Sequence, residues 1–300
     1  MKIAIVLNQE SGTLRDTPIG EYCRFLEDLC QAHDHDAEIV TAGGKQISGE
    51  LKKAFSAKTN DTVFAAGGDG TISTAAALAW KSGKPLGVIP AGTMNLFARS
   101  LKIPLEIEDA ARGLVAGQPS MVDIATANGT PFLLQYTVGF HPKMVQRRNR
   151  EKYASRFGKI RATIVAALDM IRRPPSFSAE LSLDGKSSTM KLSSLAVSCN
   201  PYGEGHLPYA EGHTAGKLAV YLARPADAAT NAKMLADLTL GTWRGNPDIR
   251  EILATSVVLR IPSAHRRTKA AMDGELIELD EAVEFCIHPK KLPVILPGDI

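Results

Sequence analysis

Three glycines flanking an aspartate form the segment of this 300-residue chain whose residue types and spacing best suit chemistry. The segment Gly67–Thr71 follows a β-like run, Thr62–Ala66, and precedes an Ala-rich helical stretch, Ile72–Trp80. Glycines at a strand-to-helix turn let backbone N–H groups approach a ligand closely, and the helix start adds unpaired N–H groups and a positive dipole end. An acid inside such an anion-binding turn is best explained by a cation such as Mg²⁺. The segment therefore predicts a nucleoside triphosphate site with a metal at Asp69.

A second turn of the same kind follows. The run Pro85–Ile89 has the composition of a strand, Gly92-Thr93-Met94-Asn95 forms a Gly-Thr turn, and a short helix reaches Arg99. Neighbouring strands of one parallel sheet would present both turns at the same edge. We therefore expect the two turns to serve one ligand.

The elements that must position these turns alternate between strand and helix over the first 120 residues. This alternation predicts a doubly wound, Rossmann-like α/β domain with a parallel sheet, whose ligands bind outside the carboxyl ends of the strands. By this reading Asn8, Thr41, Gly67 and Gly92 all lie at that edge. The expected strands are Lys2–Leu7, Ala37–Thr41, Thr62–Ala66 and Pro85–Ile89, and the expected helices are Ile19–Cys30, Gly49–Ala57 and Ile72–Trp80.

After Val122 the pattern changes to short strands separated by turn dipeptides, which predicts an antiparallel β-sandwich. We expect an α/β domain at residues 1–122, a sandwich domain at 123–289, residues 290–300 packed back on the first domain, and a nucleotide cleft between the two. Helical inserts are expected near 142–172 and 226–242. The expected strands are Val122–Ala127, Pro131–Val138, Ser178–Leu183, Leu192–Ser198, Leu218–Leu222, Ser256–Ile261, Lys269–Met272, Glu275–Leu279 and Val283–Ile287.

Composition narrows the class of protein. A hydrophobic content of 44% is ordinary for a soluble globular chain, and a net charge of +3 is too small for a general nucleic-acid binder. The four cysteines are scattered without a CxxC pair, which favours a reducing cytoplasm. Neither a secretory leader nor an apolar run long enough to span a membrane is found, so any membrane contact should be peripheral.

Four blocks of the sequence together resemble the diacylglycerol kinase catalytic-domain family, which includes bacterial soluble lipid kinases and the sphingosine and ceramide kinases. The blocks appear in the family's order and cover nearly the whole chain. They are Gly67–Thr71, Pro85–Leu101, Val122–Ile124 and Met272–Glu275.

The resemblance implies an ATP- and Mg²⁺-dependent lipid kinase that phosphorylates a hydroxyl of a membrane lipid. Asn8 lies in a segment similar to the family's N-terminal Asn-Pro-x-Ser-Gly turn, with Gln9 in place of the proline. Asp69 and Asp123 would belong to the acidic, water-linked network around Mg²⁺. The residues predicted to bind the nucleotide are Asn8, Thr41, Gly67, Gly68, Asp69, Gly70, Thr71, Ser73, Gly92, Thr93 and Asn95.

Glu275 corresponds to the family's proposed general base. It follows the two-residue Asp273-Gly274 turn, so its carboxylate should lie near a hairpin tip, where it could align a lipid hydroxyl. From the residues alone, a solvated hairpin residue is the simpler interpretation; the resemblance favours the base.

Two departures from the family pattern affect the predicted acids. Many members have Asp where this chain has Leu96, and many bacterial members have a structural Mg²⁺ ligand where it has Ala215, so we expect that second metal site to be absent. An NAD kinase-like enzyme is one alternative function, although Asn95 is not followed by the expected Glu. A non-catalytic lipid- or nucleotide-binding relative is another.

The stretch 143–173 is the most basic part of the chain, with apolar residues at helical spacing. Such a helix could dock on an anionic membrane, or it could be a solvated helix covering the edge of the sandwich. The expected localisation is cytoplasmic with peripheral membrane association. The basic residues are Lys143, Arg147, Arg148, Arg150, Lys152, Arg156, Lys159, Arg161, Arg172 and Arg173.

Overall fold

The computed structural model describes residues 1–150, 175–203, 209–210, 212–261 and 269–298, and omits the side chains of 147–150 and 239. The described chain divides into two compact units. The first comprises residues 1–124, 212–214 and 288–300, and the second comprises 125–211 and 215–287. Each is described by itself.

The first unit is built on a parallel sheet with the strand order β2-β1-β3-β4, and the end of β16 adds to β4 at Val294. Residues Ile3–Leu7 of β1 are buried throughout. Burial on both faces explains why β1, β3 and β4 are nearly continuous apolar runs rather than alternating ones. The strands are β1 (Lys2–Asn8), β2 (Asp36–Ala42), β3 (Thr62–Gly67), β4 (Leu86–Pro90) and β16 (Ala282–Leu296).

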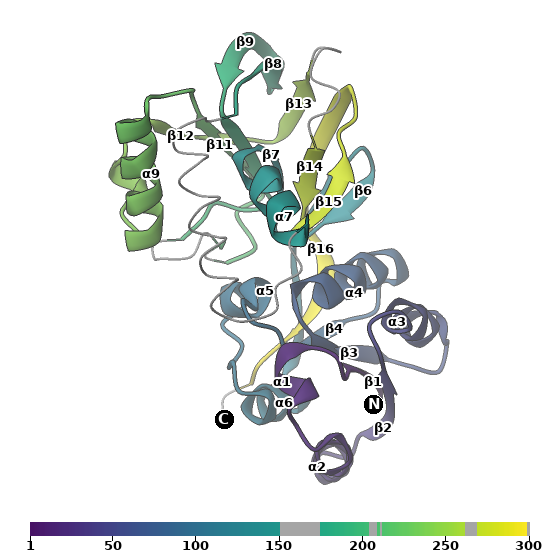
Figure 1. Cartoon of the computed structure of the whole chain (residues 1–300). Helices are drawn as coiled ribbons and strands as arrows, with labels where there is room; N and C mark the ends of the chain where they lie inside the picture. The colour runs from purple at the N-terminus through teal and green to yellow at the C-terminus, as the bar shows by residue number, and fades with distance from the viewer. Residues whose placement is uncertain (151–174, 204–208, 211, 262–268, 299–300) are drawn as a thin grey trace. The chain divides into compact units, whose positions relative to one another are not determined.

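Helices cover both faces of this sheet (Figure 1). The connection from β1 to β2 runs in the opposite direction along the sheet from the connections that lead to β3 and β4. Right-handed crossovers therefore place α2 on one face and α3 and α4 on the other, and α3 packs against α4 while α2 packs against α6. The helices are α1 (Gly12–Arg15), α2 (Ile19–Ala32), α3 (Ile47–Ser56), α4 (Asp69–Ser82), α5 (Leu96–Ser100) and α6 (Ile107–Val115).

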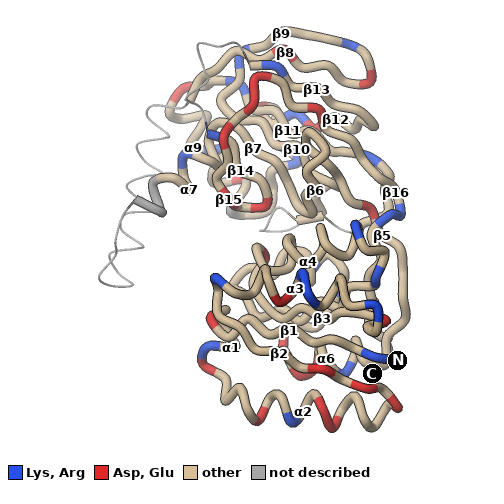
Figure 2. The backbone as a smooth tube through the Cα atoms, turned by 90° about the vertical axis from the view of Figure 1, so that its right-hand side faces the viewer, with Lys and Arg blue, Asp and Glu red and all other residues tan. Residues whose placement is uncertain are grey.

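The helix α2 shows how the spacing of apolar residues determines which face of a helix is buried. It buries Tyr22, Leu26 and Cys30, which recur every fourth residue along one face. Acidic and basic residues are interspersed along the same helix, as Figure 2 shows, and they occupy its solvent face.

The second unit contains two layers of antiparallel strands. One sheet has the order β12-β11-β10-β7-β14-β15, and in the other β16 is followed by β13, β8 and β9, while β5 pairs with β16 and β6. The strands are β5 (Gln118–Ala127), β6 (Thr130–Phe132), β7 (Gln135–Gly139), β8 (Phe177–Leu183), β9 (Lys186–Leu192), β10 (Ser194–Ser198), β11 (Leu218–Ala223), β12 (Ile249–Ala254), β13 (Ser256–Arg260), β14 (Lys269–Met272) and β15 (Glu275–Glu278).

The inner faces of these two sheets share one apolar core. Tyr136 on β7 packs edge-on against Phe285 on β16, with ring centroids 5.0 Å apart, and Phe285 also meets Phe132. The layers therefore form the predicted sandwich, and the fold class, an α/β unit followed by an antiparallel unit, is confirmed.

Three details of the second unit differ from expectation. The predicted strand Pro131–Val138 is two strands: β6 closes the Asn128-Gly129 hairpin with β5, and β7 joins the other sheet. The strands β9 and β12 were not expected. β9 is an almost fully exposed edge strand of polar residues, so it lacks the apolar alternation by which strands are recognised.

The described helices of the second unit are α7 (Phe140–Arg150) and α9 (Ala228–Leu240), and α9 is followed by a short 3-10 turn at Trp243–Gly245. α9 confirms the insert expected near 226–242. The basic stretch 143–173 is described only as far as Arg150, and the rest of that prediction lies outside the described residues. Within the described ranges, no helix is long and apolar enough to cross a membrane.

Candidate functional site

The first glycine turn joins β3 to α4 without a side-chain cap. Gly68 is the N-cap residue, and α4 begins at Asp69. The first N–H groups of a helix have no acceptor within it, so the start of α4 offers donors and a positive dipole end to an anion. A Cβ on Gly67 would lie 2.6 Å from the Cβ of Thr71, so only glycine fits there. Glycine at position 67 therefore allows the tight turn from β3 into α4.

The second turn joins β4 to α5 and is closed by its own asparagine. Asn95 has a positive φ of 51°, and its side chain both accepts from Gly92 N (2.9 Å) and donates to Gly92 O (3.0 Å). Asparagine tolerates this left-handed backbone better than most residues. Thr93, at the tip of the turn, is exposed.

The two glycine turns touch each other. A Cβ on Gly92 would lie 2.5 Å from the Cα of Gly68, so the two backbones are in direct contact. The expectation that both turns meet at one edge of the sheet thus corresponds to a physical contact between glycines. Gly92 could not carry even an alanine without moving main chain, whereas a Cβ on Gly68 would lie at an ordinary contact distance, 3.5 Å, from the Cα of Gly92.

Asp69 links the turns in a way that the sequence did not predict. Its Oδ1 accepts from Leu96 N (2.7 Å) and its Oδ2 from Asn95 N (3.1 Å). The carboxylate therefore occupies the N-terminus of α5, where a negative charge is stabilised by the free N–H groups. The half-buried Leu96 side chain supplies no acid, but its backbone N–H holds Asp69 in place.

Asn8 connects the first turn to the start of α1. Its Nδ2 donates to Thr71 Oγ1 (3.0 Å), while its Oδ1 accepts from Glu10 N (3.2 Å). Thr41 is exposed one residue before the end of β2, and Asn8 pairs in register with the last residue of that strand, Ala42. The predicted residues Asn8, Thr41, Gly67, Gly68, Asp69, Gly70, Thr71, Ser73, Gly92, Thr93 and Asn95 thus all lie at the carboxyl edge of the sheet or in the helices that start there.

Asp123 occupies a different environment from Asp69. It is fully buried in β5, its backbone N–H donates to His213 O (2.7 Å), and its Oδ1 accepts from Lys290 N (2.9 Å). Among the described residues, no group of three or more His, Cys, Asp or Glu side chains is placed to hold a metal ion. A metal here would need ligands beyond these side chains, such as substrate phosphates.

His213 is a residue that sequence reasoning left without a role. It is 2% exposed, its Nε2 lies 2.5 Å from Ser100 Oγ, and its ring packs edge-on against Phe97. Burial lowers the pKa of His213 to about 3, so the ring is neutral at physiological pH. Both neighbours belong to α5, so this histidine supports the helix that follows the second turn. A lone histidine in a Gly-rich segment gave no signal for this.

In the second unit, Glu275 is the exposed first residue of β15. The turn before it is held firmly: Asp273 accepts hydrogen bonds from the backbone N–H groups of Leu133 (2.8 Å), Leu134 (2.8 Å) and Gln135 (3.1 Å). Its own N–H donates to Gln135 O (2.9 Å). The expected position of Glu275 at a hairpin tip therefore comes with an anchor two residues earlier, at Asp273. Elsewhere in this unit, Ala215 N donates to Asn200 Oδ1 (3.1 Å).

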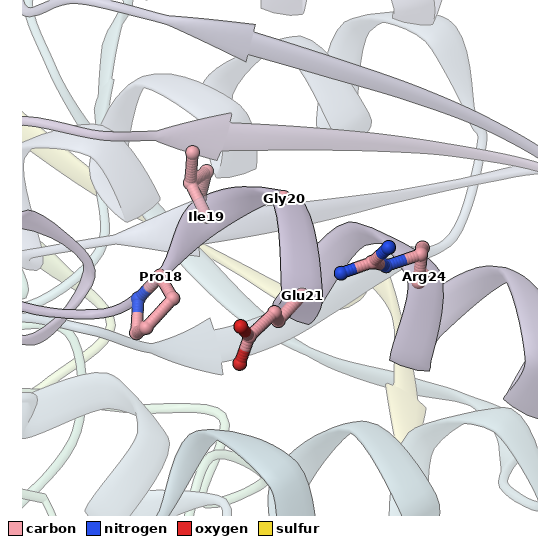
Figure 3. Close-up of a pocket in the computed structure, with 5 residues that line it drawn as sticks. All are labelled: Pro18, Ile19, Gly20, Glu21 and Arg24. Carbon is pink, nitrogen blue, oxygen red and sulfur yellow. The ribbon is translucent and has the colours of Figure 1, made fainter.

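A surface hollow lies at the first turn of α2 (Figure 3). It contains none of the predicted site residues. Its lining consists of Pro18, Ile19, Gly20, Glu21 and Arg24.

Comparison with known proteins relates this geometry to a family. Residues 2–127 match the family model of the diacylglycerol kinase catalytic domain. An uncharacterized protein of Synechocystis sp. is 29% identical over 274 residues, which cover 87% of this chain and 61% of that protein, so the chain spans about three fifths of this relative. A Staphylococcus epidermidis protein named "Putative lipid kinase" is 22% identical over 317 residues, covering 97% of this chain and 95% of that protein.

A similar fold is found among solved structures. A crystal structure from Bacillus anthracis, described as that of a diacylglycerol kinase, aligns with a TM-score of 0.72 at 17% identity and covers 98% of this chain and 96% of that one. At that identity the match establishes the fold. The family model shows that residues 2–127 form a domain of the diacylglycerol kinase catalytic-domain family.

Proposed function

We propose that the protein is an ATP- and Mg²⁺-dependent lipid kinase that transfers the γ-phosphate to a hydroxyl of a membrane lipid. The observation that carries this proposal is the contact between the two glycine turns at Gly68 and Gly92, beside the uncapped start of α4. Backbone donors without side chains in front of them are suited to phosphate oxygens. The family relationship supplies the reaction class.

The donor set at Asp69 is compatible with Mg²⁺. Each of its carboxylate oxygens accepts one N–H, and a carboxylate has about four lone-pair positions, so ligand capacity remains. Mg²⁺ commonly takes one or two carboxylates together with substrate phosphates, and it would neutralise charge on those phosphates. Asp123 is the second predicted ligand, and its burial favours an indirect part in the same network.

Glu275 is the proposed general base. Its support is the resemblance of Met272–Glu275 to the family motif and the rigid anchor that Asp273 gives to the turn before it. An exposed carboxylate on a fixed hairpin can accept the proton of a lipid hydroxyl during phosphoryl transfer. The acceptor is a diacylglycerol-like, sphingoid or ceramide-like alcohol, which the assay below distinguishes, and peripheral association with the membrane would bring the enzyme to it.

The test incubates the full chain with labelled ATP, Mg²⁺ and vesicles that contain diacylglycerol, a sphingoid base or ceramide, with NAD as a further acceptor. We expect one phosphorylated lipid, identified by mass spectrometry, and no product with EDTA. Phosphorylation of NAD alone, or binding of ATP with no transfer to any lipid, would refute the proposal.

Variants assign the roles. Asp69→Ala should abolish turnover, and Asp69→Asn should shift the Mg²⁺ concentration needed for half-maximal rate if this residue serves the metal. Glu275→Ala should lower kcat by roughly 10²- to 10⁴-fold with the KM for ATP kept. Glu278→Ala, another exposed glutamate on the same strand, is the matched control and should leave kcat unchanged. A loss of ATP affinity in Glu275→Ala would assign that residue to the nucleotide site instead.

A further inference from the structure

Glu10 carries a carboxylate that the proposed mechanism does not use. It lies in the turn after β1, and its side chain rests on the Gly43-Gly44 backbone that follows β2. A Cβ built on Gly43 would be 2.7 Å from Glu10 Oε1, and one built on Gly44 would be 2.7 Å from Oε2. The two glycines thus leave the space that this carboxylate occupies.

This position is fixed by the same residue that orients the first turn. Asn8 accepts from Glu10 N and donates to Thr71 Oγ1, in the first turn of α4. The neighbouring Gln9 N donates to Ala42 O (3.1 Å), which ties the turn to the end of β2. Glu10 is therefore held at a set distance from the proposed phosphate site rather than on a free loop.

The strand order sets that distance. β2 is two strands from β3 in the order β2-β1-β3, which corresponds to about 10 Å at the usual strand spacing of about 4.8 Å. On the other side, α1 already lies against the second turn, where Thr13 N donates to Ala91 O (3.0 Å). A nucleotide with its phosphates at the start of α4 can extend toward β2, which places its nucleoside half near Glu10.

The chemistry of a carboxylate decides what it could bind there. A negative charge would repel the phosphates, so it suits the uncharged half of the nucleotide, and an ionised carboxylate can only accept hydrogen bonds. Within the part of the chain that the structure describes, the Glu10 carboxylate has no hydrogen-bond or ion-pair partner, and the side chain is exposed. Its two oxygens can therefore receive a pair of adjacent donors.

We propose that Glu10 is a specificity-determining residue that accepts paired donors from the nucleoside of the phosphate donor. This inference rests on the nucleotide site proposed above. Paired donors are found on the two ribose hydroxyls and on the N1–H and N2–H groups of guanine. Adenine presents a donor beside an acceptor on the corresponding edge, so an interaction with ATP would be through the ribose.

Direct titration of the full chain by calorimetry with ATP, 2′-deoxyATP and GTP tests the proposal without requiring lipid transfer. If the ribose is bound, the wild type binds 2′-deoxyATP more weakly than ATP; if a base edge is bound, it prefers GTP. Glu10→Ala should weaken binding of the preferred nucleotide by roughly tenfold, which is the usual contribution of a charge-assisted hydrogen bond. It should also remove the preference for that nucleotide over the others. Glu10→Gln should also remove most of the preference.

Gly44→Ala gives an independent test that keeps the glutamate. The added methyl group would displace the carboxylate, a flexible side-chain end, while the backbone at this position needs no positive φ. It should therefore reproduce the loss of preference seen in Glu10→Ala. Two variants serve as matched controls: Gly49→Ala, whose Cβ meets nothing within 4 Å, and Glu27→Gln, an exposed glutamate in the middle of α2.

The outcomes separate this inference from the proposed function. Unchanged affinity and unchanged preference in Glu10→Ala would overturn it, as would equal effects in Gly49→Ala and Gly44→Ala. A wild type that binds no nucleotide would overturn both the site and this inference. A wild type that binds nucleotide with a Glu10-dependent preference but transfers nothing to lipid would support this inference and refute the lipid kinase.

Discussion

Replacing Asp273 with alanine should cost the second unit about 4 kcal/mol of its free energy of unfolding. The N–H of the buried Leu133 would lose its acceptor, which costs about 2 kcal/mol, and those of the half-buried Leu134 and Gln135 about 0.5 kcal/mol each, because water can reach them. Asp273 also has a positive φ of 48°, where alanine adds about 1 kcal/mol of strain.

Two further substitutions separate these contributions. Asp273→Gly accepts the backbone conformation but loses the acceptor, so it should cost about 3 kcal/mol. Asp273→Asn keeps the turn and one acceptor oxygen, so it should cost about 2 kcal/mol. The expected order of loss is therefore asparagine, then glycine, then alanine.

Asp184 is the matched control, because it has the same turn and the same kind of contact at the surface. It precedes Gly185 with a φ of 46°, and its Oδ1 accepts from Thr255 N, Thr255 Oγ1 and Ser256 N, each at 2.9 Å. The side chain is exposed, so the orphaned donors in Asp184→Ala can bind water. We expect that variant to lose about 1–2 kcal/mol, half of it or more from the φ angle.

Urea unfolding followed by tryptophan fluorescence measures these differences unit by unit. The chain has two tryptophans, Trp80 in the first unit and Trp243 in the second, so a Trp80→Phe background reports on the second unit alone. An Asp273→Ala loss no larger than that of Asp184→Ala would refute the argument that burial makes this turn costly to break.

Two further predictions concern the first unit. His213 stays neutral when folded but binds a proton below about pH 6.5 when unfolded, so stability should fall as pH drops from 6.5 toward 3, by about 2 kcal/mol at pH 5. Urea unfolding at a series of pH values measures this dependence of the free energy of unfolding on pH. His213→Gln should reduce the dependence, and His33→Gln, at an exposed histidine, should leave it as in the wild type. Equal dependence in the wild type and both variants would contradict the prediction. Gly92→Ala should destabilise the unit by about 1–3 kcal/mol and weaken ATP binding in calorimetry, because its Cβ would meet the Cα of Gly68. Gly20→Ala, with open space at the Cβ, should be neutral or stabilising, and an equal effect of the two alanines would disprove the contact argument.

The strands of the first unit were predictable because their signal is local. β1 and β3 are continuous apolar runs buried on both faces, and turn residues bound them. β9 was not predictable, since its residues face water along nearly the whole strand and its only structural determinant is pairing with β8. Edge strands of this kind depend on a partner that the local sequence does not reveal.

Three Asx-Gly turns also show that the local sequence does not reveal a distant partner. The Asx-Gly dipeptides that begin at Asn128, Asp184 and Asp273 predicted turns, and each of these three residues has a positive φ in the structure. None of them indicated that each side chain would also bind the backbone of a distant segment. The partners are the N–H groups of Glu284, Ser256 and Leu134, which lie 156, 72 and 139 residues away in the sequence.

For Asp69, the local sequence and the folded structure suggest two different explanations. A negatively charged side chain is unexpected in a turn that suits phosphate, and from the local sequence a metal ion was the natural explanation. Its bonds to Asn95 N and Leu96 N give a second explanation, because the carboxylate charge is partly balanced by the start of α5 and both turns are joined through it. The two explanations are compatible, but they differ in what a variant would reveal. Lost turnover in Asp69→Ala could come from either. Asp69→Asn keeps one acceptor oxygen for the start of α5, so an altered Mg²⁺ requirement with unchanged ATP affinity in that variant would assign the carboxylate to the metal.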